Sequence, residues 1–170
     1  SVAPKLAGLG LLIRFTHSIF MSQGLYNNDL HIASEFNWPL IMAILSAITM
    51  TIGNVLAIKQ SNIKRMLAYS SISHIGFVMM SLSVYTFTAD LSSILLYSFI
   101  YIFMNLGAFL MVIYAENDLG YKTFDDWNGF GLKKPFWGAM MSINMIALTG
   151  LPPTSGFIAK FYIFSNLISS

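Results

Sequence analysis

Long uncharged stretches alternate with short charged segments along the chain. No Asp, Glu, Lys or Arg occurs within 36–58, 66–89 or 91–115. Each stretch is about as long as the ~20 apolar residues that cross the ~30 Å hydrocarbon core of a bilayer. The stretches are continuous rather than alternating, which favours helices over the strands of a membrane barrel. The pattern predicts an all-α polytopic membrane protein.

Five membrane spans are expected, and together they form one membrane domain over residues 1–170. Their approximate bounds are 1–21, 37–58, 65–86, 91–115 and 136–167. At 1.5 Å per residue the last span would be about 48 Å long, which exceeds one straight crossing. Its middle reads GLPPTSG at 150–156, where Pro152 and Pro153 cannot donate to the carbonyls four residues before them. We therefore predict about five transmembrane helices, the last of them broken between Gly150 and Gly156.

Composition supports a membrane location and excludes several kinds of site. Of the 170 residues, 56% are hydrophobic and 9% are charged, whereas a soluble domain carries about 25% charged residues. The chain has no cysteine, so it cannot form thiolate-held iron–sulfur clusters, cysteine zinc sites or disulfides. A net charge of +2, divided among several loops, argues against a nucleic-acid partner.

Basic residues gather in two of the expected connections, and their placement predicts the orientation. Because five spans alternate in direction, the loops at 59–65 and 116–135 fall on the same side. They hold most of the basic residues, namely Lys59, Lys64, Arg65, Lys122, Lys133 and Lys134. The opposite side carries Asp29, Glu35 and Asp90, with no Lys or Arg. Basic loops face the cytoplasm, or the matrix in mitochondria, so we expect that orientation here.

Lys160 is the first candidate for chemistry, because it lies two helical turns beyond Pro153 inside an apolar segment. An ammonium near the bilayer centre costs about 2.5–3.5 kcal/mol on insertion scales, so it needs polar partners or water. The broken turn offers backbone carbonyls, and Thr154 and Ser155 offer hydroxyls. The structural alternative is that Lys160 extends to the nearby interface. The broken helix immediately before it favours a functional role.

His74 and Lys5 are the other two candidates. His74 lies ~13 Å along its helix from Arg65, close to the midplane, with Ser70 and Ser81 on the same face. A neutral imidazole both donates and accepts a proton, which suits a relay, although an interhelical hydrogen bond would also account for it. Lys5 lies in an otherwise uncharged stretch, and the residues alone leave an interfacial or a functional role equally open.

Other polar residues are interpreted structurally. Arg14 and His17 lie near the end of the first span and are expected at the interface. Asn54, Asn105 and Asn144 are expected to join helices by hydrogen bonds.

Three motifs carry a resemblance to a known family. The runs are SVAPKLAGLG at 1–10, SNIKRMLAYSSISHIGF at 61–77 and LTGLPPTSGFIAKFY at 148–162. In order and spacing they resemble the eighth, tenth and broken twelfth helices of the antiporter-like subunits of respiratory complex I, NADH:ubiquinone oxidoreductase. The form SISHIG looks more like subunit 2, called subunit N in bacteria, than the sister subunits 4 and 5.

The resemblance implies a proton path along the membrane midplane, coupled to quinone reduction elsewhere in the complex. Lys5 matches the lysine of the eighth helix, which is a connecting proton site. His74 matches a histidine that lines the path, and Lys160 matches the twelfth-helix lysine, which exchanges protons with the outer side. The implied enzyme is the whole complex, with no redox site in this chain. FMN, iron–sulfur clusters and ubiquinone are therefore expected in other subunits.

The resemblance covers helices 8–12 only, which has consequences for partners. The implied partners are other membrane-arm subunits, membrane lipids and a separate chain that supplies the missing N-terminal helices. A split mitochondrial gene is the favoured explanation over a partial fragment. The implied location is the mitochondrial inner membrane, with the bacterial plasma membrane as the alternative.

Two rival functions remain open on the sequence. One is a subunit of a multi-subunit cation/proton antiporter, which has the same fold and lacks a quinone-reducing arm. The other is a bracing fragment without an active proton path. Lys5, His74 and Lys160 argue against the brace, because apolar residues would serve a scaffold equally well.

Overall fold

The described part of the chain is built from helices. The computed structural model describes residues 2–18, 37–88 and 91–169. The elements are, in order, α1 (Val2–Thr16), α3 (Trp38–Ile58), α4 (Ile63–Thr88), α5 (Ser92–Leu119), η3 (Asp125–Trp127), α6 (Phe130–Lys133), α7 (Pro135–Thr149) and α8 (Ser155–Ser169). Among these residues no strand occurs, and α3, α4 and α5 are each long and apolar enough to cross a membrane. The prediction of an all-α polytopic membrane protein is confirmed.

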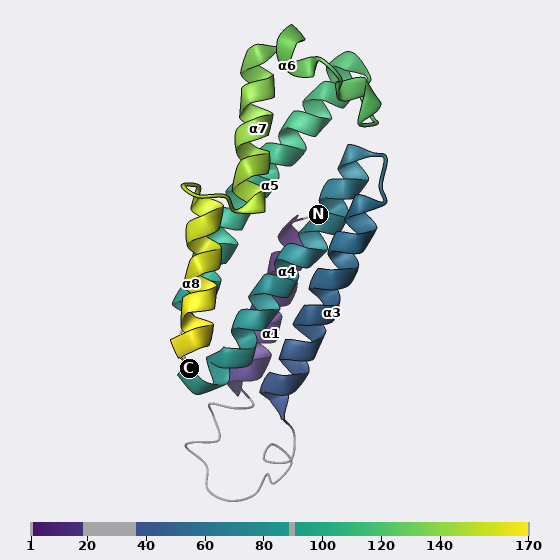
Figure 1. The fold of residues 1–170 in the computed structure, drawn as a ribbon. Coiled ribbons are helices and arrows are strands. Elements are labelled where there is room, and N and C mark those ends of the chain that lie inside the picture. The colour runs from purple at the N-terminus through teal and green to yellow at the C-terminus, as the bar shows by residue number, and fades with distance from the viewer. Residues whose placement is uncertain (1, 19–36, 89–90, 170) are drawn as a thin grey trace, which may run out of the picture.

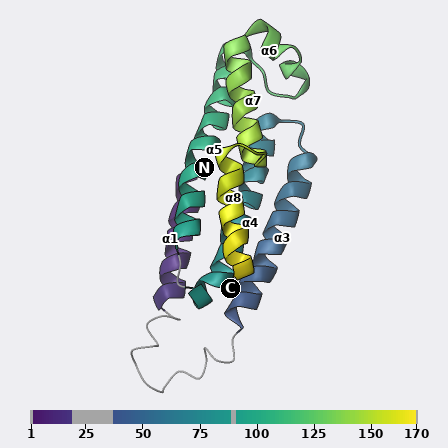
Figure 2. The same cartoon turned by 60° about the vertical axis from the view of Figure 1, so that its left-hand side comes forward.

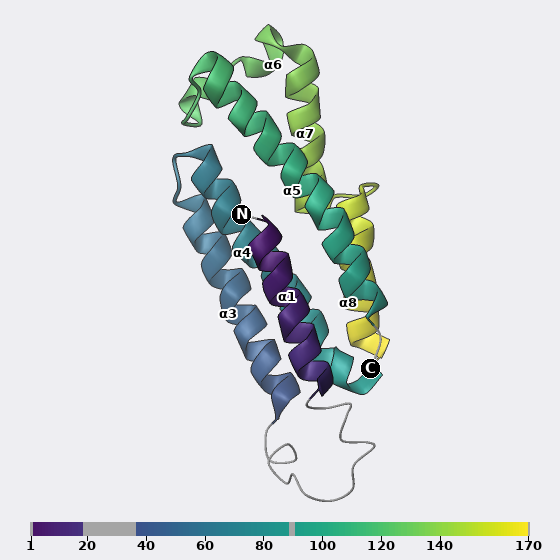
Figure 3. The same cartoon turned by 180° about the vertical axis from the view of Figure 1, so that it is seen from behind.

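The helices form two groups that α5 holds together. Helices α3 and α4 are an antiparallel pair, and α1 contacts α4 and α5 (Figures 1 and 3). Helices α7 and α8 follow each other end to end, and both contact α5 (Figure 2). The last predicted span is therefore two helices with a non-helical turn between them, as the sequence predicts. The expected connections at 26–35 and around Asp90 lie outside the described residues.

Local sequence explains where the long helices begin and end. The Asn37 side chain precedes α3, and its Oδ1 accepts a hydrogen bond from the Leu40 amide at 3.3 Å, which satisfies one of the free donors of the first turn. Helix α5 ends at Gly120, whose φ of 72° lies in the left-handed region that glycine adopts without strain. Its amide then donates to the Glu116 carbonyl at 3.0 Å.

Helices α3 and α4 pack closely because small residues face each other. A Cβ atom added to Gly53 would lie 2.7 Å from the Ser73 backbone nitrogen, so the backbones approach as near as glycine allows. Beside this point the Ser73 hydroxyl donates to Asn54 Oδ1 at 2.9 Å. Asn54 therefore makes the interhelical hydrogen bond that the sequence predicts.

Two connecting segments meet at one end of the molecule. The Ile63 amide donates to the Lys122 carbonyl at 3.3 Å, and the Phe124 amide donates to the Ser61 carbonyl at 3.2 Å. These bonds join the α3–α4 loop to the segment between α5 and α6, where Figure 1 shows both at the same end. Consecutive long helices therefore alternate in direction, as expected from the sequence.

Candidate functional site

The break between α7 and α8 provides a binding place for the Lys160 ammonium. Helix α7 ends at Gly150, whose φ is 81° and whose amide donates back to the carbonyls of Ile146 and Ala147. The next two carbonyls point instead to Lys160. Its Nζ atom donates to Leu148 O at 3.2 Å and to Thr149 O at 3.0 Å.

The two prolines explain why these carbonyls are free. In a continuous helix the carbonyls of Leu148 and Thr149 would accept from the residues four positions later, which are Pro152 and Pro153. Neither proline has an N–H. Lys160 supplies the missing donors, and its positive charge lies at the negative end of the α7 dipole. The prolines thus create the site that the lysine occupies.

Two glycines leave room for this arrangement. A Cβ atom on Gly156 would collide with the Ala147 carbonyl oxygen and lie 3.3 Å from the sulfur of Met104. The first turn of α8 therefore packs directly on the last turn of α7. A Cβ atom on Gly150 would lie 3.1 Å from Cδ of Lys160, so this glycine accommodates the lysine stem.

Lys5 is held by helix α4. The half-buried Lys5 donates through Nζ to the hydroxyl of Ser71, which is buried between the helices. Ser71 in turn donates to the Ala68 carbonyl at 2.6 Å, and its side chain lies near that of Tyr101 on α5. Ser71, rather than the Ser70 that the sequence suggested, is thus the polar neighbour one turn before His74.

His74 is buried between α4 and α5, and its contacts come from tyrosines. Its Nδ1 atom lies 2.8 Å from the hydroxyl of Tyr97, and its ring centre is 5.3 Å from that of Tyr101. The Tyr101 hydroxyl also accepts from the Asn105 amide at 3.0 Å. An imidazole in this position has both a hydrogen-bond partner and an aromatic neighbour, with little access to solvent.

One face of α4 carries His74 and lies beside both Lys5 and Lys160. Ser71, His74 and Phe77 are spaced by three residues and therefore lie on one side of the helix. Ser71 contacts Lys5, and the Phe77 ring centre lies 5.1 Å from Nζ of Lys160. Lys5 and Lys160 thus approach this face from α1 and α8, on either side of His74.

The sequence reasoning missed the tyrosines of α5, although a signal for them exists. Ser93, Tyr97, Tyr101 and Asn105 recur at every fourth residue, and all four are buried. Residues four apart lie on one helical face. Ser93 continues this polar face to α4, because its hydroxyl lies 3.1 Å from that of Ser81.

Comparison with known proteins gives the family. A family model described as "NADH:quinone oxidoreductase/Mrp antiporter, TM" matches residues 1–170. The chain belongs to this family. It is 43% identical over its whole length to NADH-quinone oxidoreductase subunit N 2 of Sorangium cellulosum, and 40% identical over 99% of its length to the subunit N 2 of Chloroherpeton thalassium. It spans 33% and 32% of these two relatives, or about a third of each.

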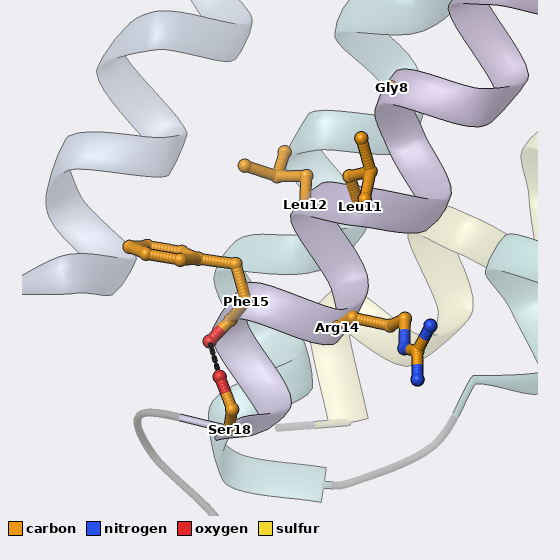
Figure 4. Close-up of a pocket in the computed structure, with 6 residues that line it drawn as sticks. All are labelled: Gly8, Leu11, Leu12, Arg14, Phe15 and Ser18. Carbon is orange, nitrogen blue, oxygen red and sulfur yellow. Dashed lines mark hydrogen bonds between the residues drawn. The ribbon is translucent and has the colours of Figure 1, made fainter.

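Within this antiporter-family chain, a surface hollow lies apart from the lysine and histidine positions. It measures about 690 Å³ and is lined by Gly8, Leu11, Leu12, Arg14, Phe15 and Ser18. All six belong to α1 or the residues just after it (Figure 4). A hollow lined by one helix does not enclose a ligand, and it contains none of the three candidate residues. Arg14 and His17, which were expected at the interface, are both exposed.

The remaining candidates add little to the site. Asn105 and Asn144 do not bond between helices as expected, because their amides donate to Tyr101 and Met140 of their own helices. Asn144 instead packs against Gly107, where a Cβ atom would lie 3.0 Å from its Cγ. Among the described residues, no group of His, Asp and Glu side chains has the arrangement of a metal site.

Proposed function

We propose that this chain is the C-terminal portion of an antiporter-like, proton-translocating subunit of NADH-quinone oxidoreductase. Lys5, His74 and Lys160 carry the protons, and quinone reduction in other subunits drives them. The observation that carries the proposal is the Lys160 ammonium, which donates to two carbonyls at a helix break within an apolar span. Broken helices of this kind bind ions in membrane transporters.

The comparisons support the oxidoreductase over the cation/proton antiporter. The family description names both kinds of complex. The Sorangium and Chloroherpeton relatives are named as oxidoreductase subunits, at 43% and 40% identity. Membrane-arm subunits are therefore the proposed partners, together with lipids and the rest of the subunit, which is either a longer chain or a separate one. FMN, iron–sulfur clusters and ubiquinone belong to other subunits in this proposal.

The contacts suit a residue that gains and loses a proton. Lys160 has neutral carbonyl partners, so its ammonium is held by dipoles rather than by a carboxylate. His74 is hydrogen-bonded at Nδ1, which leaves its other ring nitrogen free to exchange a proton. Lys5 donates to a serine hydroxyl that can pass a proton on.

The relatives and the basic loops support a proposed location and orientation. The relatives are bacterial, which favours a plasma membrane and gives no support to the mitochondrial location expected from the sequence. The segment that holds Lys59, Lys64 and Arg65 is joined by backbone hydrogen bonds of Ser61 and Ile63 to the segment between α5 and α6, which holds Lys122. By the enrichment of basic residues in cytoplasmic loops, the end of the molecule where these segments meet faces the cytoplasm.

The decisive experiment replaces Lys160 in the assembled complex. Lys160→Met keeps an unbranched apolar side chain and removes the amine, whereas Lys160→Arg keeps a charge that is not released. Both variants are expected to abolish proton pumping and to slow coupled quinone reduction. The measurement is the number of protons moved per electron in membrane vesicles, with assembly checked by the recovery of partner subunits.

A loop lysine provides the matched control. Lys59→Met makes the same chemical change at an exposed position outside the helices, and normal pumping is expected. If both Lys160 variants assemble and pump as many protons per electron as the unmodified complex, the carrier role is wrong. The bracing role would then be the better account of the chain.

A further inference from the structure

Two tyrosines are buried at the centre of the molecule beside α4. Tyr97 and Tyr101 are 1% and 3% exposed, among the lowest values of any aromatic residue described. The Tyr97 hydroxyl lies 2.8 Å from Nδ1 of His74, and the Tyr101 side chain lies near that of Ser71. Both therefore contact the residues that flank the proposed path.

Packing explains the rings of these residues and leaves their hydroxyls unexplained. The two rings are stacked, with centres 6.3 Å apart and planes at 7°. Phenylalanine would fill the same space without a polar group that must find a partner in an apolar interior. Each hydroxyl is instead matched with a polar side chain, Tyr97 with His74 and Tyr101 with Asn105. Such placement points to a use for the hydroxyls themselves.

A series of side-chain contacts leads from Lys5 towards His74. Lys5 donates to Ser71, whose side chain lies near that of Tyr101. The Tyr101 ring lies against the rings of both Tyr97 and His74. The last contact is the hydrogen bond between the Tyr97 hydroxyl and Nδ1 of His74. Among the described residues no such connection reaches Lys160, because the apolar ring of Phe77 is its neighbour on α4.

We propose that Tyr101 and Tyr97 carry protons between Lys5 and His74, an inference that rests on the function proposed above. The Ser71 hydroxyl turns from the Ala68 carbonyl towards Tyr101, and Lys5 gives its proton to Ser71 as the serine proton moves to Tyr101. With one water between the two phenol hydroxyls, Tyr97 receives a proton and delivers its own to Nδ1 of His74. Lys5 ends neutral and His74 ends as an imidazolium. Each hydroxyl gains one proton as it gives one up, so no phenolate or serine anion forms.

The test uses Tyr97→Phe and Tyr101→Phe in the assembled complex. Each change removes a single oxygen and keeps the stacked rings. We expect coupled quinone reduction to slow at least tenfold, and the rate ratio between H₂O and D₂O to increase, since proton transfer becomes limiting. Tyr114→Phe is the matched control, because it makes the same change on α5 where the ring stacks on Trp137. Its rate and its isotope ratio should not change.

A second variant tests the same path without altering the packing of the tyrosine rings. Ser71→Ala breaks the link from Lys5 to Tyr101 without changing an aromatic ring, and the same slowing and isotope effect are expected. If Lys160→Met stops pumping while the tyrosine and serine variants turn over at the normal rate, the tyrosine role is overturned and the proposed function stands. If Lys160→Met pumps normally, the proposed function fails, and the tyrosine role fails with it.

Discussion

The Lys160 ammonium nitrogen lies 5.1 Å from the centre of the Phe77 ring. The same ring is 6.4 Å from that of Tyr97 and meets Phe164 edge to face at 6.2 Å. A ring face attracts a cation through its quadrupole, yet it cannot accept and pass on a proton. Phe77 therefore separates Lys160 from the polar group formed by His74 and the tyrosines.

This separation predicts that Phe77 limits proton movement when the complex is idle. Phe77→Ala removes the ring and leaves space that water can enter beside Lys160, since that space has a polar wall. We expect vesicles that hold the variant complex to lose a pH gradient faster in the absence of NADH. Phe99→Ala is the control, because Phe99 is 61% exposed on α5. Equal rates of decay for the two variants would contradict a barrier at Phe77.

Gly156 is predicted to be intolerant of any side chain. Gly156→Ala places a methyl group against the Ala147 carbonyl, which is backbone and cannot move without shifting α7. Overpacking of this kind costs about 1–3 kcal/mol of stability, and the displaced turn should also weaken the bonds to Lys160. Thermal unfolding in detergent measures the loss. Gly131→Ala, where no atom lies within 4 Å of the new Cβ, should leave the midpoint nearly unchanged.

The loop carboxylate of Asp126 predicts a specific pH dependence. Its Oδ2 accepts from the amides of Thr123 at 2.8 Å and Lys122 at 2.9 Å, and these bonds hold the pKa of Asp126 below its ordinary value of 3.8. Stabilisation from a lowered carboxyl pKa is complete above the ordinary value and is lost as pH falls through the lower, folded value. The turn should therefore stay ordered from neutral pH down to about pH 4.

Amide hydrogen exchange is the direct measurement for this turn. The protection factors of the Lys122 and Thr123 amides should be constant between neutral pH and about pH 4, and should fall only in stronger acid. Asp126→Ala should lose that protection at every pH. A decline in the unmodified protein that begins near pH 6 would show that another group controls the turn.

Lys64 and Glu116 form an ion pair that joins the start of α4 to the end of α5. The two side chains are 40% and 26% exposed, so solvent screening limits the pair to about 0.2–1 kcal/mol. Lys64→Glu should lower the unfolding midpoint slightly through like-charge repulsion. Adding Glu116→Lys to the same chain should restore it at low salt. A double variant no more stable than the single one would argue against a direct interaction.

The sequence predicts the helix break well because prolines act locally. The absence of an N–H at Pro152 and Pro153 is enough, by itself, to identify the carbonyls of Leu148 and Thr149 as free. Lys160 binds these carbonyls rather than the hydroxyls of Thr154 or Ser155. This choice depends on the orientation of α8 about its own axis relative to α7. Sequence spacing does not determine that orientation.

The tyrosines were harder to predict, for two physical reasons. Tyr97 and Tyr101 count as apolar residues in a hydropathy pattern, so α5 reads as a uniform membrane span. Whether Ser70 or Ser71 faces the neighbouring helices is equally undetermined, because adjacent residues differ by 100° around a helix. Only Ser93 and Asn105, which lie on the same side as the two tyrosines, mark the buried face of α5 in such a pattern.

The partners of Lys160 have a consequence for the electrical balance of the bundle. When one member of a buried ion pair is removed, an opposite charge remains uncompensated, at a cost of about 3–5 kcal/mol. Lys160 is matched instead by the dipoles of two peptide groups. If its proton departs, the amine becomes neutral while the peptide groups stay neutral, so no opposite charge is left uncompensated. The site can therefore be emptied and refilled without any compensating ion having to travel with the proton.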